Sequence, residues 1–245
     1  MDTKLTGKTR IESDLIGARE IPAEALYGVQ TLRGIENFSI SKFRLSEYPL
    51  FIKGLAITKM AAAMANFELG LLTVEQKDAI IAACGEILDG KHHDQFPVDM
   101  IQGGAGTTTN MNANEVIANR ALELMGHERG EYQYCSPNDH VNCSQSTNDA
   151  YPTAIHIGMY FKHLQLLPHL EELIASFRKK GEEFSQIIKM GRTQLEDAVP
   201  MTLGQTFNGF ASILQDEIAH LNEAAADFLV VNMGATAIGL SLIHI

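Results

Sequence analysis

Hydrophobic and polar positions divide the chain into two stretches with different periods. Up to about residue 148, short helical patterns alternate with polar loops rich in glycine, proline and histidine. After that point, apolar residues recur every three or four positions along two much longer segments. The pattern predicts a mainly α-helical protein. A mixed, mostly helical N-terminal domain is expected at residues 1–147, followed at residues 148–239 by the first long helices of a central helical bundle.

Start and stop signals mark two helices in the first stretch. Pro49 suits a first helical turn, and Gly70 suits the left-handed residue that ends a helix. Thr73 and Gln76 have the spacing of a capping box, in which each side chain bonds the backbone N–H of the other residue. A second helix is therefore expected to follow them and to end at Gly90.

The remaining parts of the first stretch are less regular. A third helix is expected at residues 112–125, because apolar residues there share one face. Residues 91–106 are expected to form a loop. Residues 1–45 show no sustained period and are expected to be irregular, with a strand-like piece at residues 38–40.

The second stretch predicts two long helices, at residues 151–189 and 202–231. Their apolar seams are Leu166, Leu170, Leu173 and Phe177 on the first, and Leu214, Ile218, Leu221, Ala225 and Phe228 on the second. Seams on helices of this length pack against antiparallel neighbours or other subunits. The chain then finishes at residues 240–245 with LSLIHI, which has no cap or turn. We expect a truncated bundle with a non-native tail.

Composition narrows the class of protein. The formal net charge of −11, without any basic stripe, argues against nucleic acid and anionic membranes as partners. The longest apolar run, at residues 60–65, is too short to cross a bilayer, and the first twenty residues mix charges of both signs, unlike a signal peptide. Three cysteines without a CxxC pair fit a reducing compartment, so a cytoplasmic location is expected.

Three polar clusters stand out against this background. They are GGAGTTTNMNANE at residues 103–115, SQSTND at residues 144–149 and KMGRTQLEDAVPMTLGQ at residues 189–205. Each gathers hydroxyl and amide side chains near an expected helix start, where free backbone N–H groups and the helix dipole favour an anion. Because the chain as a whole is acidic, this attraction has to be local.

Each cluster also has a purely structural explanation. The first could be an asparagine-capped helix behind a glycine-rich loop, and the second needs only one of its residues as a cap. The third could be a connector, stabilised by an ion pair from Arg192 to Glu196 or Asp197. His92, His93 and Asp94 suggest a metal site, but no third ligand has a familiar spacing, so no metal is expected.

Taken in this order and spacing, the clusters resemble the fumarase/aspartase superfamily of lyases, and its aspartase branch in particular. The resemblance covers nearly all of residues 10–239. It extends to YGVQTLRGIENF at residues 27–38, DQFPVDMIQGGAGTTTNMNANEV at residues 94–116 and MGHERGEYQYCSPNDHVN at residues 125–142.

The resemblance implies a role for six residues in binding a dicarboxylate. Thr107 would contact the substrate near its amino group and β-carboxylate. Ser146 and Thr147 would hold the β-carboxylate, and Asn148 the amino group. Thr193 would contact the α-carboxylate. The sixth residue, Gln194, stands where many members carry histidine, although some aspartases have glutamine there.

The activity implied is the reversible deamination of L-aspartate to fumarate and ammonia, by Cβ proton abstraction through an aci-carboxylate, without an organic cofactor. A cofactor-free fumarate hydratase is the alternative, and a non-catalytic helical assembly protein is an alternative of another class. The family's general-base loop, G-S-S-x-x-P-x-K-x-N, does not occur in the chain. No catalytic residue is therefore expected within it, and the fragment should be inactive alone. The resemblance also implies a homotetramer with active sites shared among three subunits.

Overall fold

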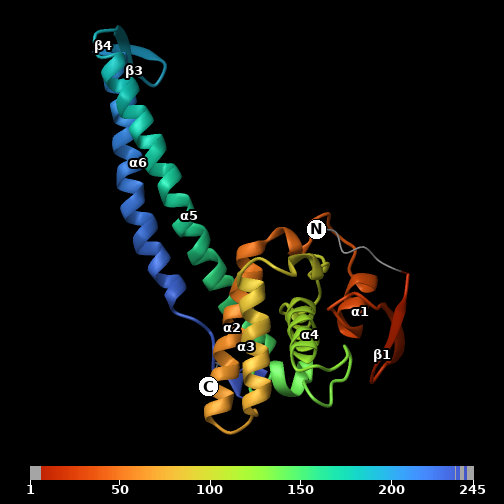
Figure 1. Ribbon diagram of the computed structural model, residues 1–245. Coiled ribbons are helices and arrows are strands. Elements are labelled where there is room, and N and C mark those ends of the chain that lie inside the picture. Colours follow the sequence, from red (N-terminus) through yellow and green to blue (C-terminus); the bar gives the residue numbers. More distant parts are fainter. Residues whose placement is uncertain (1–6, 235, 238–239, 242–245) are drawn as a thin grey trace. The chain divides into compact units, whose positions relative to one another are not determined.

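The computed structural model describes residues 7–234, 236–237 and 240–241, and most of them are helical, as expected (Figure 1). The chain forms two compact units, Met1–Met159 with Val231–Ile245, and Tyr160–Val230. The domain limits expected from the sequence remain a prediction. Of the expected tail, Leu240–Ser241 (β6) pairs antiparallel with Thr236–Ala237 (β5), and residues 242–245 lie outside the described residues.

Three helices build the core of the first unit: α2 (Pro49–Glu68), α3 (Val74–Leu88) and α4 (Thr107–Leu124). The capping box is confirmed, because Thr73 Oγ1 accepts from the Gln76 N–H at 3.2 Å and Gln76 Oε1 accepts from the Thr73 N–H at 3.1 Å. All three helices contribute large, fully buried aliphatic side chains: Ile52, Leu55, Ile80, Ile87, Ile117 and Leu122. The first two helices thus form close to the expected bounds.

Helix α2 is long and apolar enough, by length and composition alone, to cross a membrane. In the fold, 44% of its most apolar window is buried within the protein, and the core helix of a soluble protein passes the same test. The helix also carries Lys59, whose side chain is fully buried. Its buried face packs in the core of the first unit, together with buried residues of α3 and α4.

The N-terminal segment is more regular than expected. Strands β1 (Thr9–Asp14) and β2 (Gly17–Pro22) form an antiparallel hairpin, and α1 (Val29–Asn37) follows. Asp14 Oδ1 closes the turn by accepting from the N–H groups of Ile16 and Gly17 at 2.9 and 3.1 Å. Both strands are largely exposed, so the hydrophobic pattern gave no signal for them. The expected strand-like piece at residues 38–40 is not a strand.

The second unit is a helical hairpin. Helix α5 (Thr147–Glu183) runs into it from the first unit, continuing without a break through Pro168, and α6 (Leu203–Ala226) returns beside it (Figure 1). Between them, β3 (Ile188–Thr193) and β4 (Glu196–Thr202) form an antiparallel hairpin with an irregularity between Met190 and Arg192. The connector expected here is therefore a β-hairpin, whose strands are too exposed to show a buried face in the sequence.

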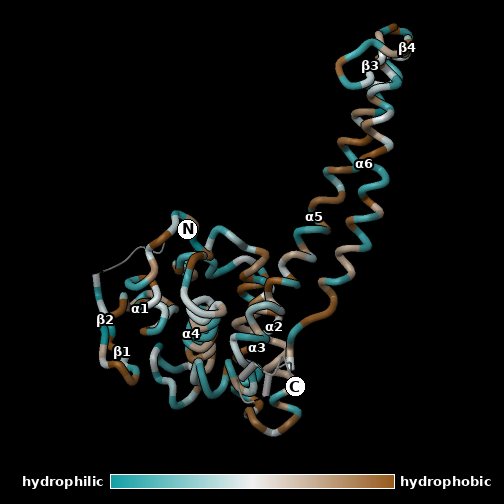
Figure 2. The backbone as a smooth tube through the Cα atoms, turned by 180° about the vertical axis from the view of Figure 1, so that it is seen from behind, coloured by the Kyte–Doolittle hydropathy of each residue, from teal (hydrophilic) through white to brown (hydrophobic). Residues whose placement is uncertain are grey.

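Hydrophobic residues recur along α5 and α6 (Figure 2). Some of them pack the two helices together. The ring centroid of Phe177 lies 6.0 Å from that of Phe207 and 5.7 Å from that of Phe210. Leu166 and Leu173, expected in the same seam, are instead 43% and 42% exposed. Helix α5 thus carries a second apolar face, which does not meet α6.

Short helical turns complete the described elements. They are Leu45–Glu47, His93–Gln95 and Asp227–Leu229, with a π-helical turn at Pro137–Val141.

Candidate functional site

The first polar cluster forms the beginning of α4. The helix starts at Thr107, earlier than the expected residue 112, because Gly106 takes the left-handed conformation (φ 90°) and supplies the N-cap position. Gln102 fixes this turn by using both ends of its amide on Thr109. Its Oε1 accepts from the Thr109 N–H at 2.9 Å, and its Nε2 donates to Thr109 Oγ1 at 2.7 Å.

The start of α4 keeps free donors. Thr107 is exposed, and among the described residues nothing accepts from the backbone N–H groups of Thr107 and Thr108. A Cβ on Gly106 would collide with the ring of Tyr151, so the glycine lets the start of α4 approach the first turns of α5. Phe51 packs edge-on against the same tyrosine ring, with centroids 5.3 Å apart, and helps to hold it there.

The second polar cluster begins α5. Ser146 Oγ accepts from the Asn148 N–H at 3.2 Å, and Asp149 Oδ1 accepts from the Ser146 N–H at 3.0 Å. Ser146 thus caps the helix, and Asp149 accepts from the Ser146 N–H in return, so Ser146 has the structural role considered for it. Thr147 and Asn148 are not needed for that cap. Thr147 is half-buried and Asn148 is exposed.

The structure brings these two clusters together. Asn110 on α4 donates from Nδ2 to Thr147 Oγ1, over 3.2 Å. The starts of two helices, each with hydroxyl groups on its first turn, therefore lie side by side. Both helix dipoles make this region favourable for a negative charge.

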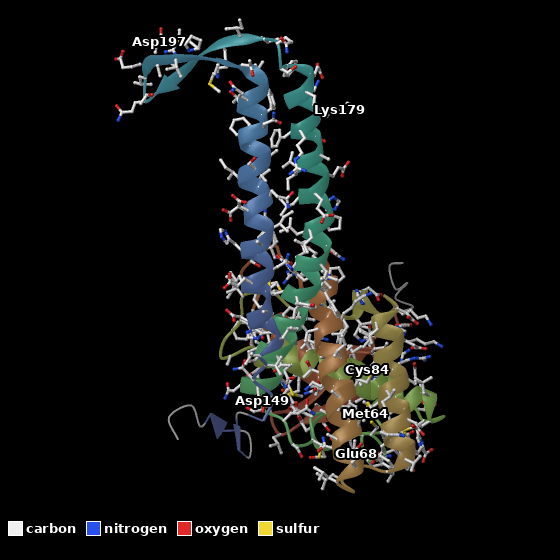
Figure 3. All side chains as sticks on the ribbon, turned by 90° about the vertical axis from the view of Figure 1, so that its left-hand side faces the viewer. Met64, Glu68, Cys84, Asp149, Lys179 and Asp197 are labelled. Carbon is white, nitrogen blue, oxygen red and sulfur yellow. The ribbon has the colours of Figure 1, made fainter. Side chains whose placement is uncertain are left out.

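A buried polar layer supports this junction, and sequence reasoning missed it. Lys59 on α2 donates from Nζ to Asn142 Oδ1 at 2.8 Å and to Gln145 Oε1 at 3.0 Å. Burial lowers the pKa of Lys59 to about 7, although the charges of Asp149 and Cys84 act in the opposite direction; both of these residues are labelled in Figure 3. A lysine among the small and apolar residues in the middle of α2 was the available signal.

The third cluster lies in the second unit. Thr193 and Gln194 are both exposed and stand at the turn of the β3–β4 hairpin, where Gln194 has φ 54°. The expected ion pair forms between Arg192 Nε and Asp197 Oδ1, 3.1 Å apart. Because the pair is exposed, it adds little to stability. Because Thr193 and Gln194 are exposed within the second unit, they can contact another molecule that binds this hairpin.

The start of α1, by contrast, is filled by side chains of the protein itself. Glu115 accepts from the N–H groups of Gly28 (2.8 Å), Gln30 (2.7 Å) and Thr31 (3.0 Å). Glu12 Oε2 accepts from the remaining Val29 N–H at 3.1 Å. Burial raises the pKa of Glu115, against the effect of these hydrogen bonds. This helix start offers nothing to an external anion, although Glu115 ends the first polar cluster.

A cavity of about 560 Å³ opens beside these carboxylates. Its lining includes Asp14, Gln30, Met111, Glu115, Tyr132 and Asn138. None of the six expected binding residues lines it.

The histidines considered for metal binding have structural partners. His92 Nε2 lies 2.8 Å from Glu86 Oε2, and His93 Nε2 lies 2.9 Å from the Ile87 carbonyl oxygen. In the described part of the chain, no group of three or more histidine, cysteine, aspartate or glutamate side chains could hold a metal ion.

Comparison with known proteins decides the family. A model of the lyase family matches residues 17–244. The chain belongs to this lyase family. Its first residues, up to 16, lie outside the match.

Relatives of this lyase chain carry more specific names. It is 57% identical over 234 residues to the aspartate ammonia-lyase of Pseudomonas canavaninivorans, covering 95% of the chain and 49% of that protein. It is 55% identical over 239 residues to the aspartate ammonia-lyase of Escherichia coli (strain K12), covering 97% of the chain and 50% of that protein.

Solved structures confirm the fold of this lyase chain. A fumarate lyase:delta crystallin from Brucella melitensis matches with a TM-score of 0.92 and 53% identity, over 96% of the chain and 51% of that structure. A class II fumarase from Schistosoma mansoni matches with a TM-score of 0.88 and 37% identity, over 96% and 49%. The chain spans about half the length of the relatives it matches.

Proposed function

We propose that the complete protein to which this chain belongs is a lyase that converts L-aspartate reversibly to fumarate and ammonia. The observation that supports a carboxylate ligand is the contact between the starts of α4 and α5, where Asn110 donates to Thr147. The chain carries a net charge of −11, so this local set of neutral donors is where an anion can bind. The relatives at 55–57% identity are named aspartate ammonia-lyases, which supports aspartate as the substrate.

The donors suit the chemistry of this reaction. Abstracting the weakly acidic Cβ proton places negative charge on the β-carboxylate, as an aci-carboxylate. Donors fixed around those oxygens stabilise the charge as it develops, and one such donor is worth about 3 kcal/mol of barrier. In the proposal Thr107, Ser146 and Thr147 serve the β-carboxylate side of the substrate, and Asn148 contacts the amino group.

The remaining contacts are proposed to come from the β3–β4 hairpin, with Thr193 at the α-carboxylate and Gln194 beside it. We propose a homotetramer in which this hairpin serves the site of a neighbouring subunit. Large exposed apolar residues on α5 and α6 support such packing: Leu164, Leu166, Leu173, Phe210 and Ile213. The general base is proposed to lie outside residues 1–245. No organic cofactor takes part, and the protein is proposed to act in the cytoplasm.

Fumarate hydration is the second candidate, because a class II fumarase shares this fold at 37% identity. It would use the same carboxylate donors with water in place of ammonia. Gln194 favours the ammonia-lyase, since many members of the superfamily, including fumarases, carry histidine there. A non-catalytic role on the same scaffold is the candidate from another class.

One assay separates these candidates. The full-length protein is purified and given L-aspartate or L-malate, and fumarate is measured. We expect fumarate from L-aspartate alone, and none from the isolated 245-residue chain. Fumarate from L-malate alone would indicate the hydratase, and no turnover of either substrate would indicate the non-catalytic role. A full-length Thr147→Val variant serves as the control for a contaminating lyase.

A further inference from the structure

We infer that Asn110 is a positioning residue, which makes the Thr147 hydroxyl a hydrogen-bond donor toward the bound ligand. The inference rests on the proposed function for the identity of that ligand, a dicarboxylate. It follows from the directions of the hydrogen bonds beneath the two polar clusters.

The chain of hydrogen bonds begins at Asn142, whose amide has only one possible orientation. One end faces Lys59 Nζ at 2.8 Å, which can only donate when the amine is protonated. The other end faces the backbone carbonyl oxygen of Gln145 at 3.1 Å, which can only accept. The atom near Lys59 is therefore the oxygen, and the atom near Gln145 is the nitrogen.

This orientation fixes Asn110 in turn. Asn110 lies 3.0 Å from the same Asn142 Oδ1, so the atom it presents there must be its NH2 group. The second hydrogen of that NH2 group points to Thr147 Oγ1 at 3.2 Å. Both hydrogens of Asn110 are thereby used, and Thr147 accepts from one of them.

A hydroxyl group that accepts here keeps its own proton for another acceptor. Among the described residues, nothing accepts the Thr147 proton, and Thr147 is only half-buried. A carboxylate can only accept, so it needs this proton. If the amide of Asn110 were reversed, Thr147 would donate to Asn110 instead, and its lone pairs would face the carboxylate.

The hydrogen bond to Thr147 distinguishes Asn110 from Asn112, a buried asparagine of the same helix. The side chain of Asn110 is 1% exposed, and its Oδ1 has no hydrogen-bond partner among the described residues. A buried amide oxygen without a partner is a cost to stability. Asn112, on the same helix and fully buried, likewise has an Oδ1 without a partner among the described residues, but it donates to the Gln95 carbonyl oxygen at 3.0 Å and has no link to Thr147.

A double-mutant cycle in the full-length protein tests the inference. The variants are Asn110→Ala, Thr147→Val and the two combined, with kcat/KM measured for L-aspartate. We expect Asn110→Ala to lower kcat/KM about tenfold in the wild-type background, and less than twofold in the Thr147→Val background, because the hydroxyl it orients is already gone. A merely structural effect would lower kcat/KM by the same factor in both backgrounds, and that result overturns the inference.

Asn112→Ala is the matched control, and its effect should be the same in both backgrounds. If Asn110→Ala does not fold, Asn110→Ser replaces it, since serine keeps a polar group but is too short to reach Thr147. The urea midpoints of the same proteins give a second cycle, which needs no turnover. If the wild-type protein does not convert L-aspartate, the proposed function fails by itself. The coupling in the urea midpoints then decides the Asn110–Thr147 link, and additive shifts reject it.

Discussion

Glu115 on α4 accepts a hydrogen bond from the backbone N–H of Gly28, over 2.8 Å, immediately before α1. The same carboxylate accepts from Gln30 and Thr31, so one side chain satisfies most of the free donors at this helix start. The bond joins residues 87 positions apart in the sequence. It ties the N-terminal segment to the helix that begins in the first polar cluster.

Replacing this carboxylate should therefore destabilise the first unit. Glu115→Gln leaves one oxygen in place of two and puts an NH2 group against backbone N–H donors. We expect the free energy of unfolding to fall by about 1–3 kcal/mol, the cost of leaving buried donors unpaired. Urea unfolding measures it. Glu68→Gln, at an exposed position on α2, is the control and should change little; equal effects of the two substitutions would contradict the prediction.

Gly106 should resist substitution for two independent reasons. Its backbone has φ 90°, which costs a residue with a side chain about 1–2 kcal/mol, and an added Cβ would strike the Tyr151 ring. Gly106→Ala should therefore lower the urea midpoint. Gly85→Ala, inside α3 with no atom within 4 Å of the added Cβ, should raise it, since alanine favours a helix over glycine by roughly 0.5–1 kcal/mol.

Lys59 should make stability depend on pH in a defined direction. Its pKa falls on folding from 10.5 to about 7, so between these values the unfolded chain holds a proton that the folded chain lacks. The free energy of unfolding then rises with pH across this window. Measured from pH 7 to pH 9, the wild-type protein should gain stability relative to Lys59→Met. A constant difference would show that Lys59 does not titrate there.

Asp99 should have the opposite dependence, at acid pH. The Ser41 hydroxyl, together with the N–H groups of Ile40, Ser41 and Ile101, lowers the pKa of Asp99 to about 2 from 3.8. Its stabilising effect is present above the ordinary value and is lost as the pH falls through about 2. Acid unfolding followed by circular dichroism should show Asp99→Asn less stable than wild type at pH 5. The two curves should converge toward pH 2.

Sharing of the site among subunits can be tested by mixing variants. In the full-length protein, Thr147→Ala and Thr193→Ala should each lower kcat/KM at least tenfold, or about 1.4 kcal/mol. If the two residues come from different subunits, unfolding and refolding the two variants together should restore part of the activity. If both come from one subunit, the mixture should stay as inactive as its parents.

The sequence was most informative where hydrophobic period and end signals agreed, as in α2 and α3. It was least informative for the two exposed hairpins, since strands without a buried face show no alternation of apolar residues. The start of α4 was misplaced in part because the amide of Gln102, which fixes the turn at Gly106 by bonding Thr109, spans seven residues and has no local pattern. Lys59 was missed for a similar reason, since its partners Asn142 and Gln145 are far along the chain.

The two hydrogen bonds between the Gln102 amide and Thr109 have a further consequence for binding. These bonds join the side chain of Gln102 to Thr109 and so close the glycine-rich stretch between them into a small ring. Closing the segment reduces the number of conformations open to it before a ligand arrives. Association then costs less, because a preorganised segment does not have to be ordered by the ligand. The glycines allow a ligand to approach the backbone closely. The side chain of Gln102, just before them, limits the flexibility that the glycines would otherwise give to the segment.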